Sequence, residues 1–313
     1  RAAEAFHGLF GSESQTFFVA TGTAANVLAI ASLTEPWQQV ICHEHSHYND
    51  DESTAPERIT HCRAVPVRTH ESKLTPASLE PLLARSRGDV HQPQPGVVTI
   101  SNPTEFGTVY TPEEVRTLCE LAHSAGYRVH VDGARFANAV ASVDRPANEL
   151  AGAAGVDALS FGGTKNGLAF GEAVVFFRQE TGERFERAVK TFPFHRKGTG
   201  QLLSKHRFAA AQFAATIETG AWLTHARHAN GMAERLGRGL TELGMAPAFP
   251  VEANAVFVTL PPAVDAALTS AGHGYYGFGD PEHGLSRLMC SFDTSADEVD
   301  ALIQDAAHAL QKA

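Results

Sequence analysis

The sequence predicts an α/β fold with a mostly parallel central sheet and helices on both faces, followed by a smaller α+β domain. Short, continuously apolar runs alternate with helical patterns over the first part of the chain, as expected for strands buried on both faces of a parallel sheet. An alanine-rich helical region then runs from about 200 to 243 past Gly220, and a strand, helix, strand, helix pattern follows. The chain has 313 residues, of which 43% are hydrophobic, which supports two unequal domains. We predict a large domain over 1–205 and a small domain over 206–313.

The large domain opens on an amphipathic helical pattern and then alternates strands with helices. The sequence begins inside that pattern and without a methionine, so we expect an N-terminal segment to be absent from it. The predicted strands are TFFVA (16–20), QQVIC (38–42), PGVVTIS (95–101), YRVHVD (127–132), VDALSF (156–161) and EAVVFF (172–177). The helical run GTAANVLAIASL (22–33) follows the first strand, which is the β/α order of a parallel sheet.

The helix predicted over 111–125 carries its own start and stop signals. Thr111 is the expected N-cap, and Pro112 takes the first helical position. Glu114, three residues after the cap, completes a capping box, and Gly126 is the stop signal. These local signals make this helix the best-defined element of the sequence.

Composition excludes several classes of function. The net charge is −10, with 35 acidic and 25 basic residues, and no Lys/Arg stripe follows the chain, so nucleic acid is not an expected partner. No apolar run approaches the roughly 20 residues that a membrane-spanning helix needs, so no membrane is expected either. The four cysteines are scattered without a CxxC pair, which suits a reducing compartment, and we predict the cytoplasm.

Four short stretches at the ends of predicted strands carry the chemical signal. They are TGTAAN (21–26), HVDGARFANA (130–139), SFGGTKNG (160–167) and RLMCSFD (287–293). In open α/β sheets ligands bind beyond the carboxyl ends of the strands. The four positions therefore agree with one another before any chemistry is assigned.

Each stretch is ambiguous when it is taken alone. Lys165 lies in a glycine-rich turn where a planar ligand can approach and form a Schiff base, but a solvated loop lysine is the simpler explanation. Asp132 could pair with a protonated pyridine nitrogen, with a Coulomb interaction energy of roughly 5 kcal/mol before desolvation costs, at about 3 Å and an effective dielectric of about 20. A structural ion pair between Asp132 and Arg135 fits the sequence as well. Gly22 and Thr23 open a helix whose free N–H groups favour a phosphate, although such helix starts are common.

The segment ICHEHSHYNDDE (41–52) suggests a zinc site. Its three histidines alternate along the chain, so on a strand their side chains would face one side and converge on a metal ion. The candidate ligands are His43, His45 and His47, with Asp50, Asp51 or Glu52 completing the shell. An exposed, solvated loop has the same spacing, and this alternative stays open at this point.

The constellation as a whole points to one cofactor. A phosphate cradle, a carboxylate for a ring nitrogen and a Schiff-base lysine are the three fixed points of pyridoxal 5'-phosphate binding. From about residue 6 to the C-terminus, the chain resembles the low-specificity L-threonine aldolases of the β-eliminating lyase group. The motifs ATGTAAN, HVDGAR and LSFGGTKNG carry the resemblance in this order. It implies the architecture of pyridoxal-phosphate-dependent transferases of fold type I.

The resemblance also implies which residues bind the cofactor. Lys165 would form the Schiff base, Asp132 would pair with the pyridine nitrogen, and Arg135 would donate a hydrogen bond to the phenolate oxygen. The phosphate would be held by Gly22, Thr23 and Thr164.

On the substrate side, Arg287 matches the arginine that binds the substrate carboxylate, a task suited to its planar fork. His47 aligns with the histidine that stacks over the pyridine ring and is our candidate for the catalytic base. Glu52 would support the site. No metal is then expected, and His43 and His45 have no assigned role.

Two departures from the family pattern limit this assignment. Glu105 stands where some members have a second active-site histidine, and a family serine near the substrate carboxylate would fall in the absent N-terminal segment. The basic cluster HRK (195–197) is either a solvated charge run or reaches the phosphate of a neighbouring subunit. We predict a homodimer or homotetramer with shared active sites.

The predicted reaction is the retro-aldol cleavage of L-threonine, L-allo-threonine or related β-hydroxy-α-amino acids, such as phenylserine, to glycine and an aldehyde. One alternative is another pyridoxal-phosphate-dependent β-eliminating lyase or a racemase that acts on a small amino acid. The second alternative is a metal-dependent hydrolase that uses His43, His45 and His47. In each case the expected partner is a small molecule.

Overall fold

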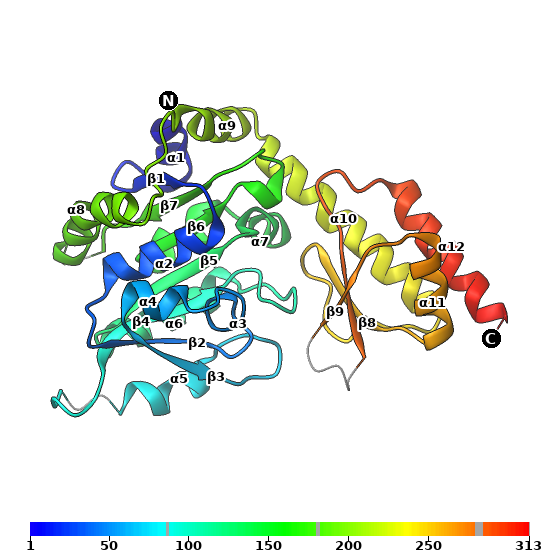
Figure 1. The fold of residues 1–313 in the computed structure, drawn as a ribbon, viewed down its shortest axis with the longest axis horizontal. Coiled ribbons are helices and arrows are strands. Elements are labelled where there is room, and N and C mark those ends of the chain that lie inside the picture. Colours follow the sequence, from blue (N-terminus) through cyan, green and yellow to red (C-terminus); the bar gives the residue numbers. More distant parts are fainter. Residues whose placement is uncertain (86–87, 180–181, 279–283, 313) are drawn as a thin grey trace.

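A seven-stranded sheet forms the larger part of the molecule, and a three-stranded sheet forms the smaller part (Figure 1). The computed structural model describes residues 1–85, 88–179, 182–278 and 284–312. Helix α10 (Ala221–Glu242) joins the two parts, because it packs against α7 (Phe136–Val143) of the larger part and α12 (Ala296–Lys312) of the smaller part. None of the described helices combines the length and the apolar composition that are needed to cross a bilayer.

The larger sheet contains all six predicted strands and one more. The strands are β1 (Gln15–Val19), β2 (Gln38–His43), β3 (Arg63–Val67), β4 (Gln94–Ser101), β5 (Arg128–Gly133), β6 (Ala158–Gly162) and β7 (Glu172–Phe176). Strand β3, RAVPV, escaped prediction because it is an edge strand, where proline is tolerated and a continuous apolar run is not needed.

The sheet is mostly parallel, as predicted. Its strand order is β1-β7-β6-β5-β4-β2-β3, and only β7 runs against its neighbours, β1 and β6. The other neighbouring pairs are parallel, so the carboxyl ends of β2, β4, β5 and β6 meet at one edge.

Helices cover both faces of this sheet. The helices of the larger part are α1 (Ala2–Phe10), α2 (Gly22–Leu33), α3 (His47–Asp50), α4 (Ala55–Thr60), α5 (Pro76–Leu83), α6 (Pro112–Ser124), α7, α8 (Glu183–Gly198) and α9 (Arg207–Glu218). Short 3-10 turns lie at η1 (Ala147–Leu150), η2 (Gly152–Ala154) and η3 (Thr164–Asn166).

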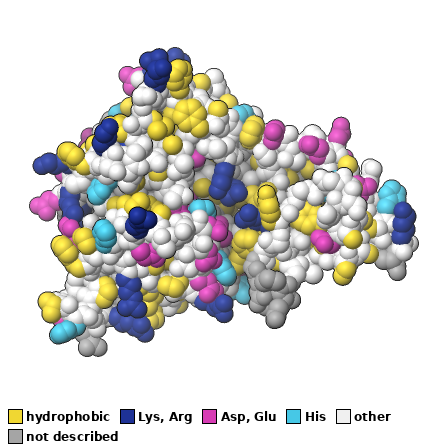
Figure 2. Space-filling view, in the orientation of Figure 1, with side chains coloured by type: hydrophobic (Ala, Val, Ile, Leu, Met, Phe, Trp, Pro, Cys, Tyr) yellow, Lys and Arg dark blue, Asp and Glu magenta, His cyan; other side chains and the backbone are white. Residues whose placement is uncertain are grey.

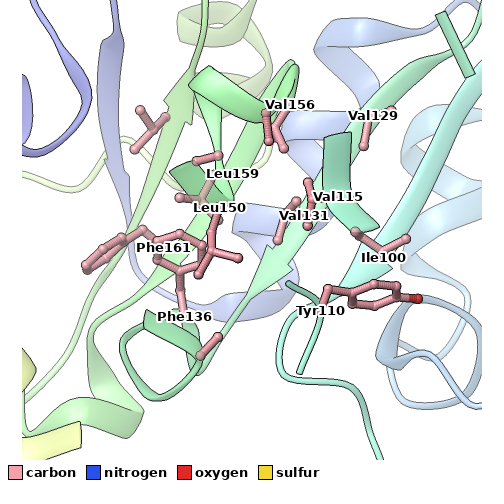
Figure 3. Packing of buried hydrophobic residues seen from close by; sticks show 14 of the residues in the cluster. Ile100, Tyr110, Val115, Val129, Val131, Phe136, Leu150, Val156, Leu159 and Phe161 are labelled. Atoms are coloured by element: carbon pink, nitrogen blue, oxygen red, sulfur yellow. The ribbon is translucent and has the colours of Figure 1, made fainter. Parts of the chain in front are cut away.

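Alternate strand residues enter different cores. Val129 and Val131 of β5 pack with Val115 of α6 on one face, as Figure 3 shows. On the other face, Ala158 of β6 packs with Leu28 of α2. This two-sided burial explains why the strands appear in the sequence as continuous apolar runs.

The local helix signals act as predicted. The Thr111 side chain accepts a hydrogen bond from the Glu114 amide, the Glu114 side chain accepts one from the Thr111 amide, and α6 ends at Ser124.

The helical region predicted across Gly220 is instead two helices, α9 and α10. Gly220 has a φ of 74°, a left-handed conformation that ends one helix and starts the next.

The smaller sheet places one face against helices and the other toward the larger part. It consists of β8 (Ala255–Thr259), β10 (Leu285–Met289) and β9 (Tyr276–Phe278) in antiparallel order, and it is covered by α10, α11 (Pro262–Ala271) and α12. Val256 and Leu288 enter the helix-covered core. Because strand side chains alternate, Arg287 points to the opposite face. The domain boundary near residue 206 stays a prediction.

Candidate active site

A cleft between the two sheets brings together most of the predicted site residues. The space between the side chains that line it, including the part that is open to solvent, is about 480 Å³. Five of the predicted residues line it: His47, Asp132, Arg135, Lys165 and Arg287. Figure 2 shows basic and acidic side chains gathered in the hollow between the larger and the smaller part.

Asp132 lies at the carboxyl end of β5 and is 8% exposed. Its Oδ1 accepts a hydrogen bond from the Ala134 amide at 2.9 Å, and its Oδ2 accepts one from Asn26 Nδ2 at 2.7 Å. Among the described residues, no ion pair joins Asp132 to Arg135 or to any other cation, so the structural pairing that we left open is not observed. The carboxylate is anchored on one side and lines the cleft on the other.

Asn26 and Glu52 extend this anchor to His47. Asn26 Nδ2 also donates to Glu52 Oε1 at 2.8 Å, and His47 Nδ1 lies 3.0 Å from the same oxygen. A hydrogen-bonded chain of side chains therefore runs from the half-buried His47 through the buried Glu52 and Asn26 to Asp132. Sequence reasoning missed Asn26, although it is the last residue of the TGTAAN motif that was singled out for its glycine and threonine.

His47 begins the short helix α3, which directly follows the turn after β2. The bond to Glu52 raises the pKa of His47 above its usual range, although partial burial opposes this. The His47 amide donates to Glu105 Oε1 at 3.3 Å. Within the described ranges, His47 Nε2 has no hydrogen-bond partner.

The other two histidines of the segment have different surroundings. Strand β2 ends at His43, so the three histidines do not share a strand face as the zinc hypothesis required. His43 Nδ1 lies 3.0 Å from Ser72 Oγ, and His45 Nδ1 lies 3.3 Å from Asp50 Oδ2. No cluster of three metal-binding side chains occurs in the described part of the chain.

Lys165 lies in the 3-10 turn η3, directly after β6. A Cβ atom on Gly163 would come within 2.5 Å of the Gly171 carbonyl oxygen, so only glycine fits there. The side chain of Lys165 is open to the cleft. The protein around the amine replaces part of its water, and this desolvation, followed by the charge of the nearby Arg135 guanidinium, lowers the pKa of Lys165. A lysine amine with a lowered pKa is the form that attacks a carbonyl carbon.

Glu172 holds the lysine turn in place and was not predicted. Its carboxylate is 8% exposed at the start of β7, and Oε2 accepts a hydrogen bond from the Gly163 amide at 2.6 Å. Burial raises the pKa of Glu172. The feature of the sequence that could have indicated this role is the carboxylate at the start of the apolar strand EAVVFF.

The predicted phosphate residues lie beside the cleft. Gly22 and Thr23 start α2, whose N-cap Thr21 accepts a hydrogen bond from Ala24. Thr23 precedes Asn26 by three residues, which is less than one helical turn, and Asn26 contacts Asp132. Thr164 directly precedes Lys165 in η3. None of the three predicted phosphate residues belongs to the described lining of the cleft itself.

Arg287 enters the cleft from the smaller sheet. The strand alternation places it opposite Leu288, and its guanidinium carbon lies 5.3 Å from the centre of the Phe278 ring. Its Nε atom is buried and has no partner among the described residues. Burial lowers the pKa of the neighbouring Arg135, and the Arg287 charge adds to this effect. Two arginines close together favour an anion between them.

Glu105 also lines the cleft. Its Oε1 accepts a hydrogen bond from Ser101 Oγ at 3.2 Å in addition to the bond from the His47 amide. Burial, followed by the charge of Asp132, raises the pKa of Glu105. The position that departs from the family pattern is therefore within the site.

The chain is similar to known proteins along most of its length. Residues 1–262 match the family model described as β-eliminating lyase. A low-specificity L-threonine aldolase from a Pseudomonas species is 41% identical over 307 residues, which cover 97% of this chain and 86% of that protein. A Leishmania major threonine aldolase structure has a TM-score of 0.90 at 27% identity and covers 98% of this chain and 88% of its own.

A more distant structure shows the fold alone. A variant serine palmitoyltransferase from S. paucimobilis, with a bound aldimine of pyridoxal phosphate and myriocin, has a TM-score of 0.71 at 16% identity, over 99% of this chain and 75% of its own. The architecture is therefore that of pyridoxal-phosphate enzymes of fold type I, as predicted.

Proposed function

The chain belongs to the β-eliminating lyase family and is a carbon–carbon lyase of the threonine aldolase type, and we propose that the cleft around Lys165 is its active site. The substrates we propose are L-threonine, L-allo-threonine and related β-hydroxy-α-amino acids such as phenylserine, which are cleaved to glycine and an aldehyde. The gathering of Lys165, Asp132, His47 and Arg287 in one cleft is the observation that carries this proposal.

The residues of the cleft fit pyridoxal 5'-phosphate, the cofactor that the family implies. The donor set has the required chemistry: a lysine with a lowered pKa, a buried carboxylate and an arginine whose Nε atom lacks a partner in the described structure. The start of α2 adds the amides of Gly22 and Thr23, which no described side chain or carbonyl accepts from. Free amides at a helix start favour a phosphate.

Each of these residues would then have one task. Lys165 Nζ would hold the cofactor at its aldehyde carbon, and Asp132 would hold a proton on the pyridine nitrogen. Arg135 would donate to the phenolate oxygen, and the phosphate would be held by Gly22, Thr23 and Thr164. When bound, the cofactor supplies a protonated ring that withdraws electrons from the α-carbon of an amino acid.

The remaining residues would orient the substrate and move its proton. Arg287 would hold the substrate carboxylate and thereby fix which bond of the α-carbon is weakened. His47 Nε2 would take the proton of the β-hydroxyl group, either directly or through water, while Nδ1 stays bonded to Glu52. The neutral form of His47 is the one that accepts this proton.

Aldehyde release tests this proposal. The purified protein supplied with pyridoxal phosphate should release acetaldehyde from L-threonine and benzaldehyde from L-phenylserine, together with glycine. Another lyase or a racemase of the same cofactor would instead give a keto acid or the D-amino acid. A visible absorbance band that accompanies activity, without stoichiometric zinc in elemental analysis, would exclude the metal-dependent hydrolase built on His43, His45 and His47.

We also propose that the chain forms a homodimer or homotetramer with shared sites and works in the cytoplasm. Large apolar side chains are exposed around α8 and α9, namely Phe194, Leu202, Leu203 and Phe208. Such a patch favours a protein partner. The four cysteines are unpaired and buried, which supports a reducing compartment. Sedimentation of the loaded enzyme tests the assembly, since a monomer would contradict it.

A further inference from the structure

We infer that Asn26 is a positioning residue of this site, whose side-chain amide holds the carboxylates of Asp132 and Glu52 side by side and joins the cofactor end of the cleft to His47. The inference rests on the proposed function, because Asp132 and His47 act there. Asn26 itself does not line the cleft.

The amide group uses both of its hydrogens in this arrangement. Asn26 Nδ2 donates to Asp132 Oδ2 at 2.7 Å and to Glu52 Oε1 at 2.8 Å, and a primary amide has two N–H bonds to give. Asn26 and Glu52 are each 3% exposed, so water does not compete for these bonds. One side chain therefore sets the orientation of two carboxylates.

The orientation of the amide is determined by its neighbours. A flipped amide would place Oδ1 against both carboxylate oxygens, which would leave Asp132 Oδ2 without a donor and Glu52 Oε1 with His47 Nδ1 alone. In the observed orientation, Asn26 Oδ1 is buried and has no partner in the described structure. The fold thus leaves one amide oxygen unsatisfied in order to give both carboxylates a hydrogen bond.

The two carboxylates need this donor because they are close together and buried. A buried carboxylate has lost contact with water, and a hydrogen bond from an amide hydrogen offsets part of that loss. The charged and titratable groups around Asn26 are Glu52, Asp132, His47, Glu105, Arg135 and Lys165. With both carboxylates held by the Asn26 amide, Asp132 can pair with a ring nitrogen while Glu52 orients His47.

The helix that carries Asn26 explains why its position is exact enough for this task. Helix α2 is buried from Ala24 to Ser32, so its side chains have little freedom to shift.

Asn138 on α7 provides a matched control, since it is also 3% exposed and its Nδ2 donates to another side chain, Asn230 Oδ1, at 2.9 Å. No carboxylate accepts from Asn138 within the described residues.

The experiment compares Asn26→Ala, Asn26→Asp and Asn138→Ala with the parent, each loaded with pyridoxal phosphate. We measure kcat for aldehyde release between pH 5.5 and 8.5, and the Kd of the cofactor by equilibrium dialysis at both ends of that range. Each value is divided by that of the parent at the same pH, which removes the titration of His47 itself.

Asn26→Ala should lower kcat by about tenfold or more at every pH, the size of one lost bond to a charged group, and it should weaken cofactor binding. At pH 8.5, Asn26→Asp should lower kcat relative to the parent by as much as Asn26→Ala does. At pH 5.5, the kcat of Asn26→Asp relative to the parent should be at least about fivefold higher than at pH 8.5. Its carboxyl group has a pKa raised by burial and by two anions, so at low pH it is protonated and donates one hydrogen. A residue with only a space-filling role would show no such pH-dependent recovery.

Three results would overturn the inference. The first is a kcat and a cofactor Kd of Asn26→Ala within threefold of the parent values. The second is an Asn26→Asp ratio that does not change with pH, and the third is an equal loss in Asn138→Ala. A parent protein that releases no aldehyde would refute the proposed function instead, while the Kd ratios would still test Asn26. If Asn26→Ala does not fold, the pH dependence of the Asn26→Asp ratio decides.

Discussion

The Nδ1 atom of His47 lies 3.0 Å from Oε1 of Glu52, whose side chain is completely buried. The His47 side chain is 31% exposed, so one ring nitrogen is held inside the protein and the ring still reaches the cleft. A carboxylate that accepts from Nδ1–H leaves the Nε2 lone pair free for a proton. This relationship makes His47 the best placed proton acceptor among the described side chains of the cleft.

Replacing Glu52 should move the acid limb of the pH profile. In the parent, the bond to Glu52 is the largest cause of the raised His47 pKa, and activity should rise with pH as His47 loses its proton. Glu52→Gln removes the charge, so the acid limb of kcat/KM should shift to lower pH by up to about one unit. Asp51→Asn, an exposed neighbour, should leave the limb in place. An unmoved limb in Glu52→Gln would mean that another group is the base.

The three histidines of the segment should differ in their effect on activity. His47→Asn should keep the visible absorbance of the cofactor but cleave L-threonine at least about tenfold more slowly, the low end of general base contributions. His43→Asn and His45→Asn should stay nearly active, because their ring nitrogens contact Ser72 and Asp50 rather than the cleft. Equal inactivation of all three variants, together with inactivation of the parent by a chelator, would revive the zinc hypothesis.

Asp132→Asn should separate cofactor binding from catalysis. The variant keeps the shape of the side chain but loses the charge that would hold a proton on the pyridine nitrogen. We expect the cofactor to remain bound and kcat to fall by orders of magnitude, as a loss of a few kcal/mol implies. Equilibrium dialysis and aldehyde release measure the two effects. Retention of most of the activity would show that Asp132 has a structural role only.

Lys165 should carry the cofactor covalently. Borohydride reduction of the loaded enzyme, followed by digestion and mass spectrometry, should place the label on the peptide that contains Lys165, and Lys165→Ala should show no turnover. Lys197 and Lys205 serve as internal controls because both are exposed. A label on either of them would refute the assignment.

Glu105→Gln should stabilise the cofactor-free protein in a pH-dependent way. The folded state raises the pKa of Glu105 through burial and through Asp132, so the unfolded chain releases this proton at lower pH than the folded chain. Stability is therefore lost as the pH rises from the unfolded pKa of about 4.3 toward the higher folded pKa. Glu105→Gln should match the parent in Tm near pH 4 and exceed it near pH 8, on the order of 2 °C. A Tm difference that is the same at both values would contradict this account.

Local signals explain why much of the fold follows from the sequence. The helix α6 has its cap, its capping box and its stop signal within 16 consecutive residues, TPEEVRTLCELAHSAG, and these interactions join only residues that are close in the sequence. The buried strands of the larger sheet are likewise visible as apolar runs. Strand direction has no such local signal, and the antiparallel course of β7 between β1 and β6 follows from how the chain returns to the sheet.

The sequence by itself determined the residue types of the site and their positions at strand ends, because glycine-rich turns, a carboxylate after a buried strand and a helix start are short-range patterns. Tertiary structure alone decided which of these residues cooperate. Asn26 and Glu52 are separated by 26 positions and Asn26 and Asp132 by 106, and Arg287 comes from a separate sheet. Hydrogen bonds act only over about 3 Å. A contact between residues so distant along the chain is therefore created by packing, and no spacing in the sequence records it.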